Sequence, residues 1–348
     1  MKKHAIIPIF IPHQGCPNDC VFCNQRNITA RTQIPETQDV RDTIEKYLPT
    51  LAGRGLETIE IAFFGGSFTG IPIDLQTRYL EIAKEYKDKG LIHKIHLSTR
   101  PDTINREILD NLKLYEVDII ELGVQSFDEE VLHLSNRGHN VSCVYESSAL
   151  IIDYGFELGL QLMIGLPGDT LEKDLFSARE LVRIGPSVAR LYPTIVIKDT
   201  RLYDMYQESQ YAPLTQEAAV NITKEMVKII SEAGINIIRI GLKSTDVIND
   251  SSQGSITGGT FHPAFRQLVE SEIAKDDLEN QLKEFMCRNP DKHITVAFVS
   301  RNESFSNMVG NNKINKKYFA EKYPCVKIEY IIDNSLANNE YKLKEDKK

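Results

Sequence analysis

Alternating strand and helix patterns constrain the fold of this chain more than any other feature. Short β-branched apolar runs alternate with segments of helical periodicity up to about residue 240. The expected strands are 6–11, 58–64, 94–99, 118–124, 157–164, 187–192 and 236–240, and the expected helices lie near 37–52, 74–89, 103–115, 141–154, 170–184 and 216–233. Such alternation implies parallel strands joined by right-handed crossovers. The sequence therefore predicts an α/β fold, which is either a partial or full (β/α) barrel or a doubly wound open sheet.

The segment after the last of these strands has a different composition. It is rich in Gly, Ser, Thr and Asn, and it is followed by a long helical pattern that starts at Pro263. Strand patterns at 294–299 and 326–332 then flank a polar helical stretch, which predicts one more β-α-β unit. The expected segments are a barrel over 1–245, a Gly/Ser-rich connection over 246–262, a helix with a small α/β extension over 263–335, and a frayed tail over 336–348.

Composition and charge exclude several classes of protein. With 41% hydrophobic and 26% charged residues, the chain is typical of a globular protein and not of a disordered one. The net charge of −8 provides no general basic field for nucleic acid, and the lysines within 313–322 are more typical of a solvated face. The apolar N-terminal run is broken by Pro8 and Pro12 and is too short for a membrane span or a signal peptide. We therefore expect a cytoplasmic protein without membrane segments.

Three of the six cysteines are clustered directly after the first expected strand. Cys16, Cys20 and Cys23 have the spacing C-x₃-C-x₂-C. Because cytoplasmic thiols stay reduced, this clustering indicates a metal site, and three thiolates can hold a [4Fe–4S] cluster with one iron open to a small molecule. A zinc site with His13 as fourth ligand and a set of unbound thiols are the alternatives. The remaining cysteines lack metal spacing and are expected to be inert thiols: Cys143, Cys287 and Cys325.

Polar and glycine residues gather where the expected strands end. The turn Gly65-Gly66-Ser67 follows the second strand, and paired glycines let a backbone approach a ligand closely. Because barrel active sites form at the carboxyl ends of the strands, residues at such ends are candidates for ligand binding.

These motifs carry a resemblance to a known family. The cysteine motif, with Phe22 before its last cysteine, resembles the signature of the radical S-adenosylmethionine (SAM) superfamily. Together with the Gly-Gly-Ser turn and further motifs, the chain resembles the radical-SAM half of the Elongator catalytic subunit, a tRNA wobble-uridine modifying enzyme. It resembles oxygen-independent coproporphyrinogen dehydrogenase more distantly. The further motifs lie at 97–102, 121–126, 136–139, 160–168 and 190–200, and the resemblance covers roughly 5–245.

The resemblance implies a fold, cofactors and site residues. It implies a full or partial barrel whose cluster loop follows the first strand, and a SAM molecule that chelates the open iron. An external low-potential electron donor would drive cleavage of SAM to methionine and a 5′-deoxyadenosyl radical. By position, the cluster ligands are matched by Cys16, Cys20 and Cys23, and the motif that contacts the SAM amino group is matched by Gly65, Gly66 and Ser67. Polar contacts to SAM are matched by Gln125 and Arg137, and a contact to its ribose by Gln161. Ser98 stands where relatives often have glutamate.

The implied function is that of a radical SAM enzyme that abstracts hydrogen from an unidentified substrate. An RNA base is one candidate substrate, although the net charge gives it no support. The alternative is a non-catalytic cluster-binding or haem-binding protein of the chaperone type related to the coproporphyrinogen enzyme. The chain ends soon after the expected barrel and shows no glycine-rich acetyl-CoA loop, so we expect it to lack the acetyltransferase domain of the Elongator subunit.

Overall fold

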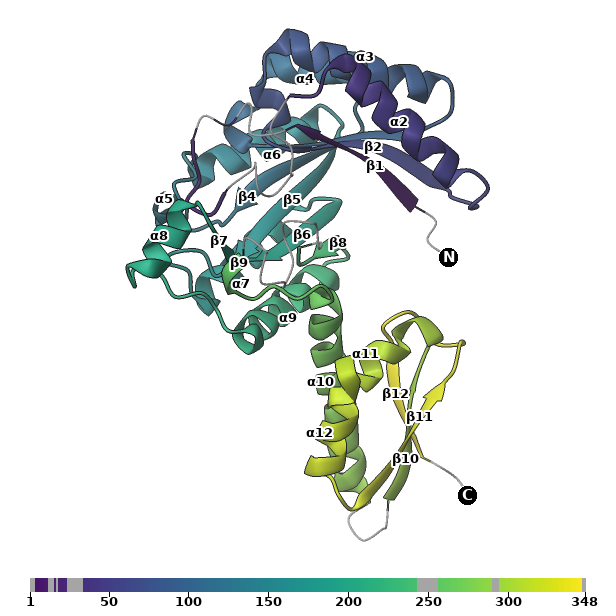
Figure 1. Ribbon diagram of the computed structural model, residues 1–348. Helices are drawn as coiled ribbons and strands as arrows, with labels where there is room; N and C mark the ends of the chain where they lie inside the picture. The colour runs from purple at the N-terminus through teal and green to yellow at the C-terminus, as the bar shows by residue number, and fades with distance from the viewer. Residues whose placement is uncertain are drawn as a thin grey trace. The chain divides into compact units, whose positions relative to one another are not determined.

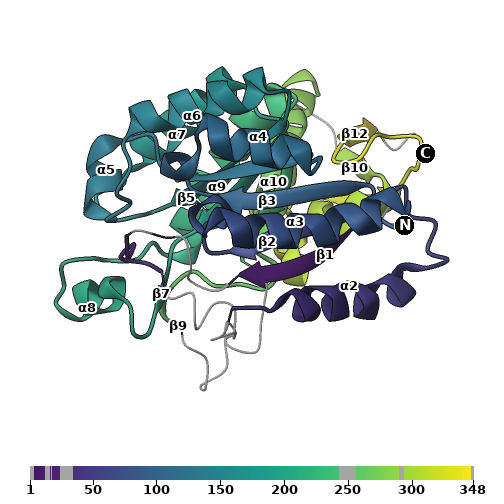
Figure 2. The same cartoon turned by 90° about the horizontal axis from the view of Figure 1, so that it is seen from above.

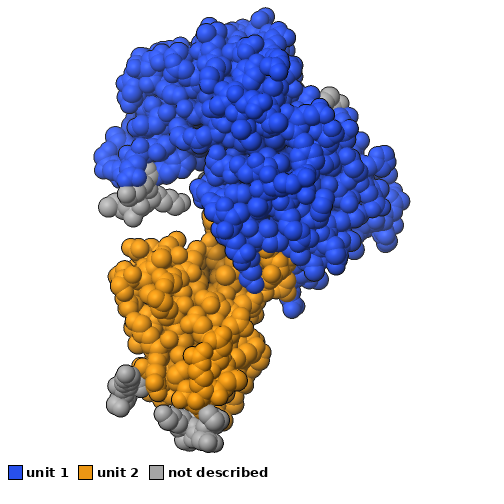
Figure 3. Space-filling view, turned by 180° about the vertical axis from the view of Figure 1, so that it is seen from behind, with its two compact units in different colours: residues 1–219, 226–263 blue, residues 220–225, 264–348 orange. Residues whose placement is uncertain are grey.

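The computed structural model describes residues 4–11, 16, 18–23, 34–242, 256–289 and 294–345. The chain forms two compact units (Figure 3). Unit 1 comprises residues 1–219 with 226–263, and unit 2 comprises residues 220–225 with 264–348. Among the described residues, no helix has the length and apolar character needed to cross a membrane.

Unit 1 is built on a curled sheet of seven parallel strands (Figure 1). The strands follow one another across the sheet in chain order: β1 (His4–Ile11), β2 (Thr58–Gly65), β3 (Lys94–Thr99), β4 (Ile119–Gln125), β5 (Glu157–Ile164), β6 (Val188–Pro193) and β8 (Asn236–Ile240). Sequential order without a reversal distinguishes a barrel-type sheet from a doubly wound one. Within the described ranges β1 and β8 are the edges of the sheet, so the predicted barrel is confirmed in its partial form.

Helices cover the outer face of this sheet (Figures 1 and 2). They are α2 (Thr37–Leu51), α3 (Ile73–Asp88), α4 (Arg106–Leu114), α5 (Glu129–Leu134), α6 (Val141–Asp153), α7 (Leu171–Ile184) and α9 (Gln216–Glu232), with the short helices η1 (Phe68–Gly70) and η2 (Pro101–Thr103) at the carboxyl ends of β2 and β3. Side-chain caps explain where several of them begin. The capping residues accept a hydrogen bond from the third backbone N–H of their helix: Asn105, Asp128, Asn140, Thr170 and Thr215.

Alternation along the strands separates an apolar face from a polar one. On β2, Ile61 and Phe63 are fully buried beneath the helices, and the Phe63 ring stacks on Tyr79 of α3 with 6.2 Å between centroids. The intervening Phe64 points to the inner face, where its ring meets His96 of β3 edge-on at 5.5 Å. Because side chains alternate along a strand, the same division continues on the neighbouring strands. The helices therefore pack on one face, and the inner face remains for polar groups.

Glu60, His96 and Glu121 are buried on the inner face, and together with the largely buried Arg190 side chain they form what we call the polar layer. Glu121 Oε2 lies 2.6 Å from Arg190 Nε, and its Oε1 accepts a hydrogen bond of 3.0 Å from Ser98 Oγ. His96 lies between the two carboxylates, with Nδ1 3.3 Å from Glu60 Oε1 and Nε2 3.7 Å from Glu121 Oε2. The layer thus joins strands β2, β3, β4 and β6 through polar contacts.

Packing and charge hold the polar layer in place. The Arg190 guanidinium lies over the Phe64 ring, 4.8 Å from its centroid, and a Cβ on Gly159 would lie only 3.2 Å from the Glu121 Cβ. Burial opposes the Arg190 charge, but Glu121 offsets it and raises the pKa of Arg190. Burial likewise favours neutral Glu60, yet hydrogen bonding to His96 lowers the pKa of this carboxyl. Both ends of the layer therefore stay charged because they are paired.

A second buried group of acids lies where β5 leads into α7. Asp169 and Asp174 are hydrogen-bonded to each other, and burial raises the pKa of both, that of Asp169 to about 6. The negative charge of Asp169 raises the pKa of Asp174 further. A carboxyl whose pKa is higher in the folded than in the unfolded state binds more protons when folded, so its contribution to stability declines as pH rises through and above the unfolded pKa.

Replacing Asp174 by asparagine should therefore stabilise the protein at alkaline pH. Between pH 5 and pH 8, we expect Asp174→Asn to gain free energy of unfolding relative to the original protein, because only the original protein has the carboxyl whose pKa folding raises. Urea unfolding at the two pH values measures this difference. Glu172→Gln, an exposed change in the same first turn of α7, is the control and should show no such gain. A difference for Asp174→Asn that is independent of pH would contradict a raised pKa of Asp174 in the folded protein.

Unit 2 contains a three-stranded sheet with helices. Its elements are α10 (Phe265–Arg288), β10 (Ile294–Ser300), η3 (Asn302–Ser304), α11 (Phe305–Val309), η4 (Asn311–Lys313), α12 (Ile314–Lys322), β11 (Val326–Ile332) and β12 (Tyr341–Glu345). The predicted parallel pairing of β10 with β11 is observed, and β12 is antiparallel to β10 on its other side. Leu278 and Leu282 of α10 are packed with Phe298 and Phe319 in the core of this unit.

The structure differs from the sequence-based expectation in two segments. The tail over 336–348 is expected to fray, but Tyr341–Glu345 form β12 because the Gln281 side chain bonds both Tyr341 O and Leu343 N. The connection over 246–262 contains β9 (Ile256–Gly259), which pairs with β7 (Ile195–Ile197). Each strand is short and depends on a partner that is distant in the chain, so local periodicity does not reveal it.

Candidate functional site

The cysteine loop lies at the carboxyl edge of the sheet, directly after β1. Hydrogen bonds tie it to the segment that follows α5 and to the start of α8 (Arg201–Gln207). The contacts run from Val21 N to Ser135 O at 3.1 Å, from Leu202 N to Val21 O at 2.7 Å, and from Asn136 Nδ2 to Asp19 O at 2.7 Å. Phe22 is partly buried and packs against the cluster of Val21, Val196, Leu202 and Tyr211. Phe22 thus anchors the loop between Cys20 and Cys23.

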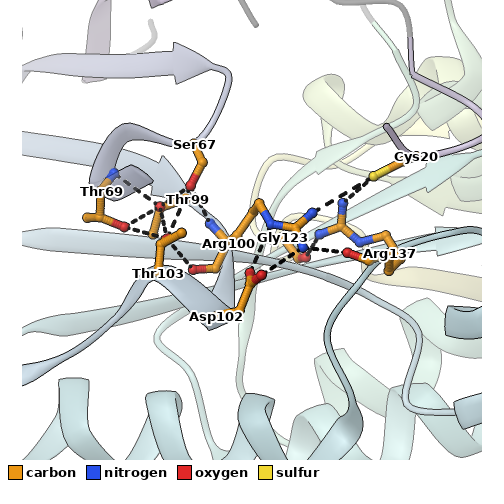
Figure 4. Close-up of polar contacts among 9 residues, drawn as sticks. All are labelled: Cys20, Ser67, Thr69, Thr99, Arg100, Asp102, Thr103, Gly123 and Arg137. Atoms are coloured by element: carbon orange, nitrogen blue, oxygen red, sulfur yellow. Dashed lines mark hydrogen bonds and ion pairs between the residues drawn. The ribbon is translucent and has the colours of Figure 1, made fainter. Parts of the chain in front are cut away.

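Two buried guanidinium groups converge on the Cys20 thiol (Figure 4). Arg137 Nη1 lies 3.1 Å from Cys20 Sγ, and Arg100 Nη1 lies 4.0 Å from the same sulfur. The exposed fractions are 3% for Arg100, 6% for Arg137 and 8% for Cys20. Arg137 Nη2 also donates to Gly123 O at the end of β4. The carboxyl edges of β3 and β4 therefore position two cations at one thiol.

The thiol and guanidinium groups at this edge fit an anionic group that is held by thiolates. Burial raises the pKa of Cys16 and the nearby Cys20 raises it further, while Arg100 and a backbone hydrogen bond from Ser67 counteract these effects. The buried Cys20 thiol beside two cations, with Cys16 near enough to interact with it, suits one side of an iron–sulfur cluster, because the cations offset the negative charge of its thiolates. In the described part of the chain, no three His, Cys, Asp or Glu side chains are gathered closely enough to hold a metal ion. His13, the fourth ligand of the zinc alternative, lies outside the described residues.

The Gly-Gly-Ser turn is pressed against the end of β1. Gly65 has φ +112°, and a Cβ there would lie 2.5 Å from Ile11 O. Gly66 N donates to the same carbonyl oxygen at 2.7 Å. Since Ile11 leads into the cysteine loop, the turn and the loop are held together by this contact. Glycine is required at position 65 both by the backbone angle and by the missing Cβ.

We expect Gly65→Ala to destabilise the protein by more than the cost of a positive φ at an alanine. Gly55 also has positive φ, but a Cβ there meets nothing within 4 Å, so Gly55→Ala is a matched control. The control should lose only about 1–2 kcal/mol of unfolding free energy. Gly65→Ala should lose more and should also lose SAM cleavage, because β1 must move away from β2. Urea unfolding and 5′-deoxyadenosine formation measure the two effects, and equal losses in both variants would contradict the role of the Ile11 contact.

Ser67 has a structural environment of its own (Figure 4). Its buried hydroxyl lies 2.8 Å from Thr99 Oγ1 and accepts a hydrogen bond of 3.2 Å from Arg100 N. Thr69 Oγ1 and Thr103 Oγ1 complete a cluster of four hydroxyl groups. The hydroxyl of Ser67 is thus engaged at the base of Arg100, so its predicted contact with SAM stays a prediction.

Gln125 and Gln161 are brought together near Arg137. Gln161 Nε2 donates to Gln125 Oε1 at 3.2 Å, and Gln125 has φ +76° at the end of β4. A Cβ on Gly123 would lie 3.0 Å from Gln125 Nε2 and 3.5 Å from Arg137 Nη2, so these two side chains meet over Gly123. Ser98 differs, because its hydroxyl donates to Glu121 of the polar layer. The structure therefore groups Cys20, Arg137, Gln125 and Gln161 and places Ser98 with the buried charges.

Sequence reasoning does not assign a role to Arg100 or Asp102, although both lie in a quoted motif. The signal that marks Arg100 is its place directly after a buried strand, followed by proline and a carboxylate. The polar layer also escapes prediction. Its signal is one charged residue in the middle of each of several apolar strands, a position that is costly unless the charges are paired.

Comparison with known families identifies the fold and the motifs. A model of the radical SAM superfamily matches residues 10–178, and a model of the radical SAM C-terminal domain matches residues 186–275. The chain belongs to the radical SAM superfamily. The resemblance seen in the cysteine motif is thereby confirmed, and the chain is a radical SAM enzyme.

Curated relatives place this radical SAM enzyme near the Elongator proteins. It is 26% identical over 256 residues to the tRNA uridine(34) acetyltransferase of Methanocaldococcus infernus, covering 63% of this chain and 48% of that protein. It is 27% identical over 269 residues to human Elongator complex protein 3, covering 65% of this chain and 49% of that protein. The chain spans about half the length of the relatives of these two kinds.

A solved structure supports the fold of the radical SAM unit. The archaeal Elp3 of Methanocaldococcus infernus, with an N-terminal deletion, aligns with a TM-score of 0.64 at 22% identity. The alignment covers 80% of this chain and 64% of that one. At this identity the likeness concerns the fold, in agreement with the sequential parallel sheet described above.

Proposed function

We propose that this radical SAM enzyme binds a [4Fe–4S] cluster through Cys16, Cys20 and Cys23 and reductively cleaves SAM to abstract hydrogen from a substrate. The observation that carries the proposal is the Cys20 thiol beside the buried guanidiniums of Arg100 and Arg137, at the carboxyl edge of the half-barrel. When bound, the cluster supplies the electron that converts SAM to methionine and a 5′-deoxyadenosyl radical.

The residues of the chain bind and orient the reactants. Arg100 and Arg137 offset the negative charge of the thiolates, and the Gly65–Gly66 turn holds the cysteine loop against β2. Gln125 and Gln161 present amide groups at the ends of β4 and β5, and hydrogen bonds from such groups suit the ribose hydroxyls and the amino acid moiety of SAM. SAM contacts of Gln125, Gln161 and Arg137 are part of this proposal.

We propose an RNA base as the substrate class. The curated relatives with the most similar sequences include proteins named tRNA uridine(34) acetyltransferase, which supports a uridine in RNA as the first candidate. The net charge of −8 supplies no long-range attraction to RNA, so binding would rest on local contacts.

Anaerobic reconstitution tests the cluster and the cleavage reaction. We expect about four iron and four sulfide per chain, and 5′-deoxyadenosine that forms only when SAM and a low-potential reductant are both present. A colourless protein that contains zinc alone would overturn the proposal. Haem binding without SAM cleavage would instead favour a chaperone.

A second experiment tests the substrate class separately. Unfractionated tRNA should increase 5′-deoxyadenosine formation by the reconstituted enzyme, and nuclease digestion of that tRNA should remove the increase. If both preparations leave the rate unchanged, the RNA assignment fails while the proposal on SAM cleavage stands.

A further inference from the structure

Arg100 has two sets of contacts that point in opposite directions (Figure 4). Its Nε and Nη2 bind the two carboxylate oxygens of Asp102, each at 2.9 Å. Its Nη1 lies on the sulfur side, 4.0 Å from Cys20 Sγ. The ion pair therefore has its positive end at the thiol and its negative end away from it.

The same guanidinium also holds the second cation in place. Arg100 Nη2 donates to the backbone oxygen of Arg137, whose own Nη1 lies 3.1 Å from Cys20 Sγ. Arg100 is anchored in turn, because its backbone N–H donates to Ser67 Oγ and η2 follows it directly. A chain of contacts thus runs from Asp102 through Arg100 and Arg137 to the thiol.

The Arg100 guanidinium keeps its positive charge although it is buried. Burial works against the Arg100 cation, but the hydrogen bonds that it donates to Asp102 offset it, so the pKa of Arg100 lies above its usual value. Burial and the charges of Arg137 and Arg100 lower the pKa of the nearby His139 to about 3. The effect on His139 supports a positive potential around the two guanidiniums.

We infer that the charges of the Arg100–Asp102 ion pair set the reduction potential of the cluster bound at Cys20. This inference rests on the proposed function. Reduction adds one electron, so a cation near the sulfur stabilises the reduced state and raises the potential, while an uncompensated anion lowers it. Because the positive end of the pair is nearer the sulfur, the intact pair favours reduction.

The two halves of the ion pair should consequently have effects of opposite sign. Asp102→Asn leaves the Arg100 charge uncompensated and should raise the potential. Arg100→Met leaves the Asp102 charge uncompensated and should lower it. The double variant loses both charges and should fall between the original protein and Arg100→Met. Each single change should alter the reduction equilibrium roughly tenfold, which corresponds to about 59 mV for one electron.

The experiment is a redox titration of the reconstituted full-length protein, followed by electron paramagnetic resonance of the reduced cluster. Iron content and circular dichroism are recorded for every variant. Asp118→Asn is the matched control, because Asp118 pairs with Lys87 at 2.7 Å at the amino end of β4. The length of the strand places it roughly 20 Å from the cysteine edge, which is beyond the screening length of about 10 Å. Its potential should equal that of the original protein.

The outcomes separate the inference from simpler explanations. Shifts of the same sign in both single variants, or unchanged potentials despite full iron content, would overturn the inference and indicate a purely structural role. If Arg100→Met does not fold, Asp102→Asn alone still decides, since it must raise the potential. If the original protein itself takes up no cluster, the proposed function fails, and this is seen before any variant is compared.

Discussion

Replacing Cys20 by alanine should abolish both cluster binding and reductive SAM cleavage. Cys20 is the buried member of the three predicted ligands, and its sulfur is the atom on which Arg100 and Arg137 converge. Without this thiolate, two ligands remain, and the two buried cations lose the anion that they face. Iron and sulfide analysis after anaerobic reconstitution, together with 5′-deoxyadenosine formation, measures the loss, which should reach the background of each assay.

Cys287→Ala is the matched control for the cysteine change. Cys287 is exposed on α10 in unit 2 and lacks metal spacing, so its removal should leave iron content and SAM cleavage unchanged. Full iron content with normal cleavage in Cys20→Ala would contradict the assignment of the cluster ligands. Loss in both variants would show that the effect comes from thiol removal in general.

Replacing Glu121 by alanine should strongly destabilise the fold. The change removes the carboxylate that lies 2.6 Å from Arg190 Nε, and it leaves that guanidinium and His96 without their shared partner in a buried layer. Removal of one member of a buried ion pair costs about 3–5 kcal/mol, because the other charge stays buried. Urea unfolding of the protein without added cluster measures this loss independently of any activity.

Glu157→Ala tests whether burial causes the effect. Glu157 of β5 pairs with Lys94 of β3 across β4, but both side chains are partly exposed to solvent. Its loss should cost about 0–1 kcal/mol, as is usual for exposed pairs. Similar costs for the two variants would mean that the polar layer carries no more energy than a surface pair.

Local patterns in the sequence were sufficient to predict the seven strands of the unit 1 sheet and six of the helices beside it, in their order along the chain, but not the short elements α5, β7, α8 and β9. Apolar alternation at Ile61 and Phe63 marks a strand beneath helices, and caps such as Thr215 mark where helices begin. The same patterns do not state whether the strands close into a barrel, because closure depends on pairing between the first and last strands. The sequential order of the sheet and its open edges settle the partial form.

The candidate site could be predicted in part. The spacing of Cys16, Cys20 and Cys23 and the turn at Gly65 predict a ligand-binding edge from neighbouring residues alone. The meeting of Gln125 with Gln161 agrees with their positions at adjacent strand ends. The two arginines at Cys20 could not be predicted as a pair, because they come from separate connections. Each long side chain could place its guanidinium at several different partners.

The sequence by itself thus determines most of the helices and strands, the position of the cysteine motif and the superfamily of the chain. Helix periodicity, strand alternation and motif spacing are properties of short segments, so they can be read without the tertiary structure. Tertiary structure alone decides which charges meet. Glu60, His96, Glu121 and Arg190 are distant in sequence, and they become partners only when four parallel strands align their inner faces. The pairing of Asp102 with Arg100 is local, but its orientation toward Cys20 arises from the packing of the cysteine loop on the sheet edge. A buried charge is costly unless it is paired, and the partners are brought together only when the sheet has formed.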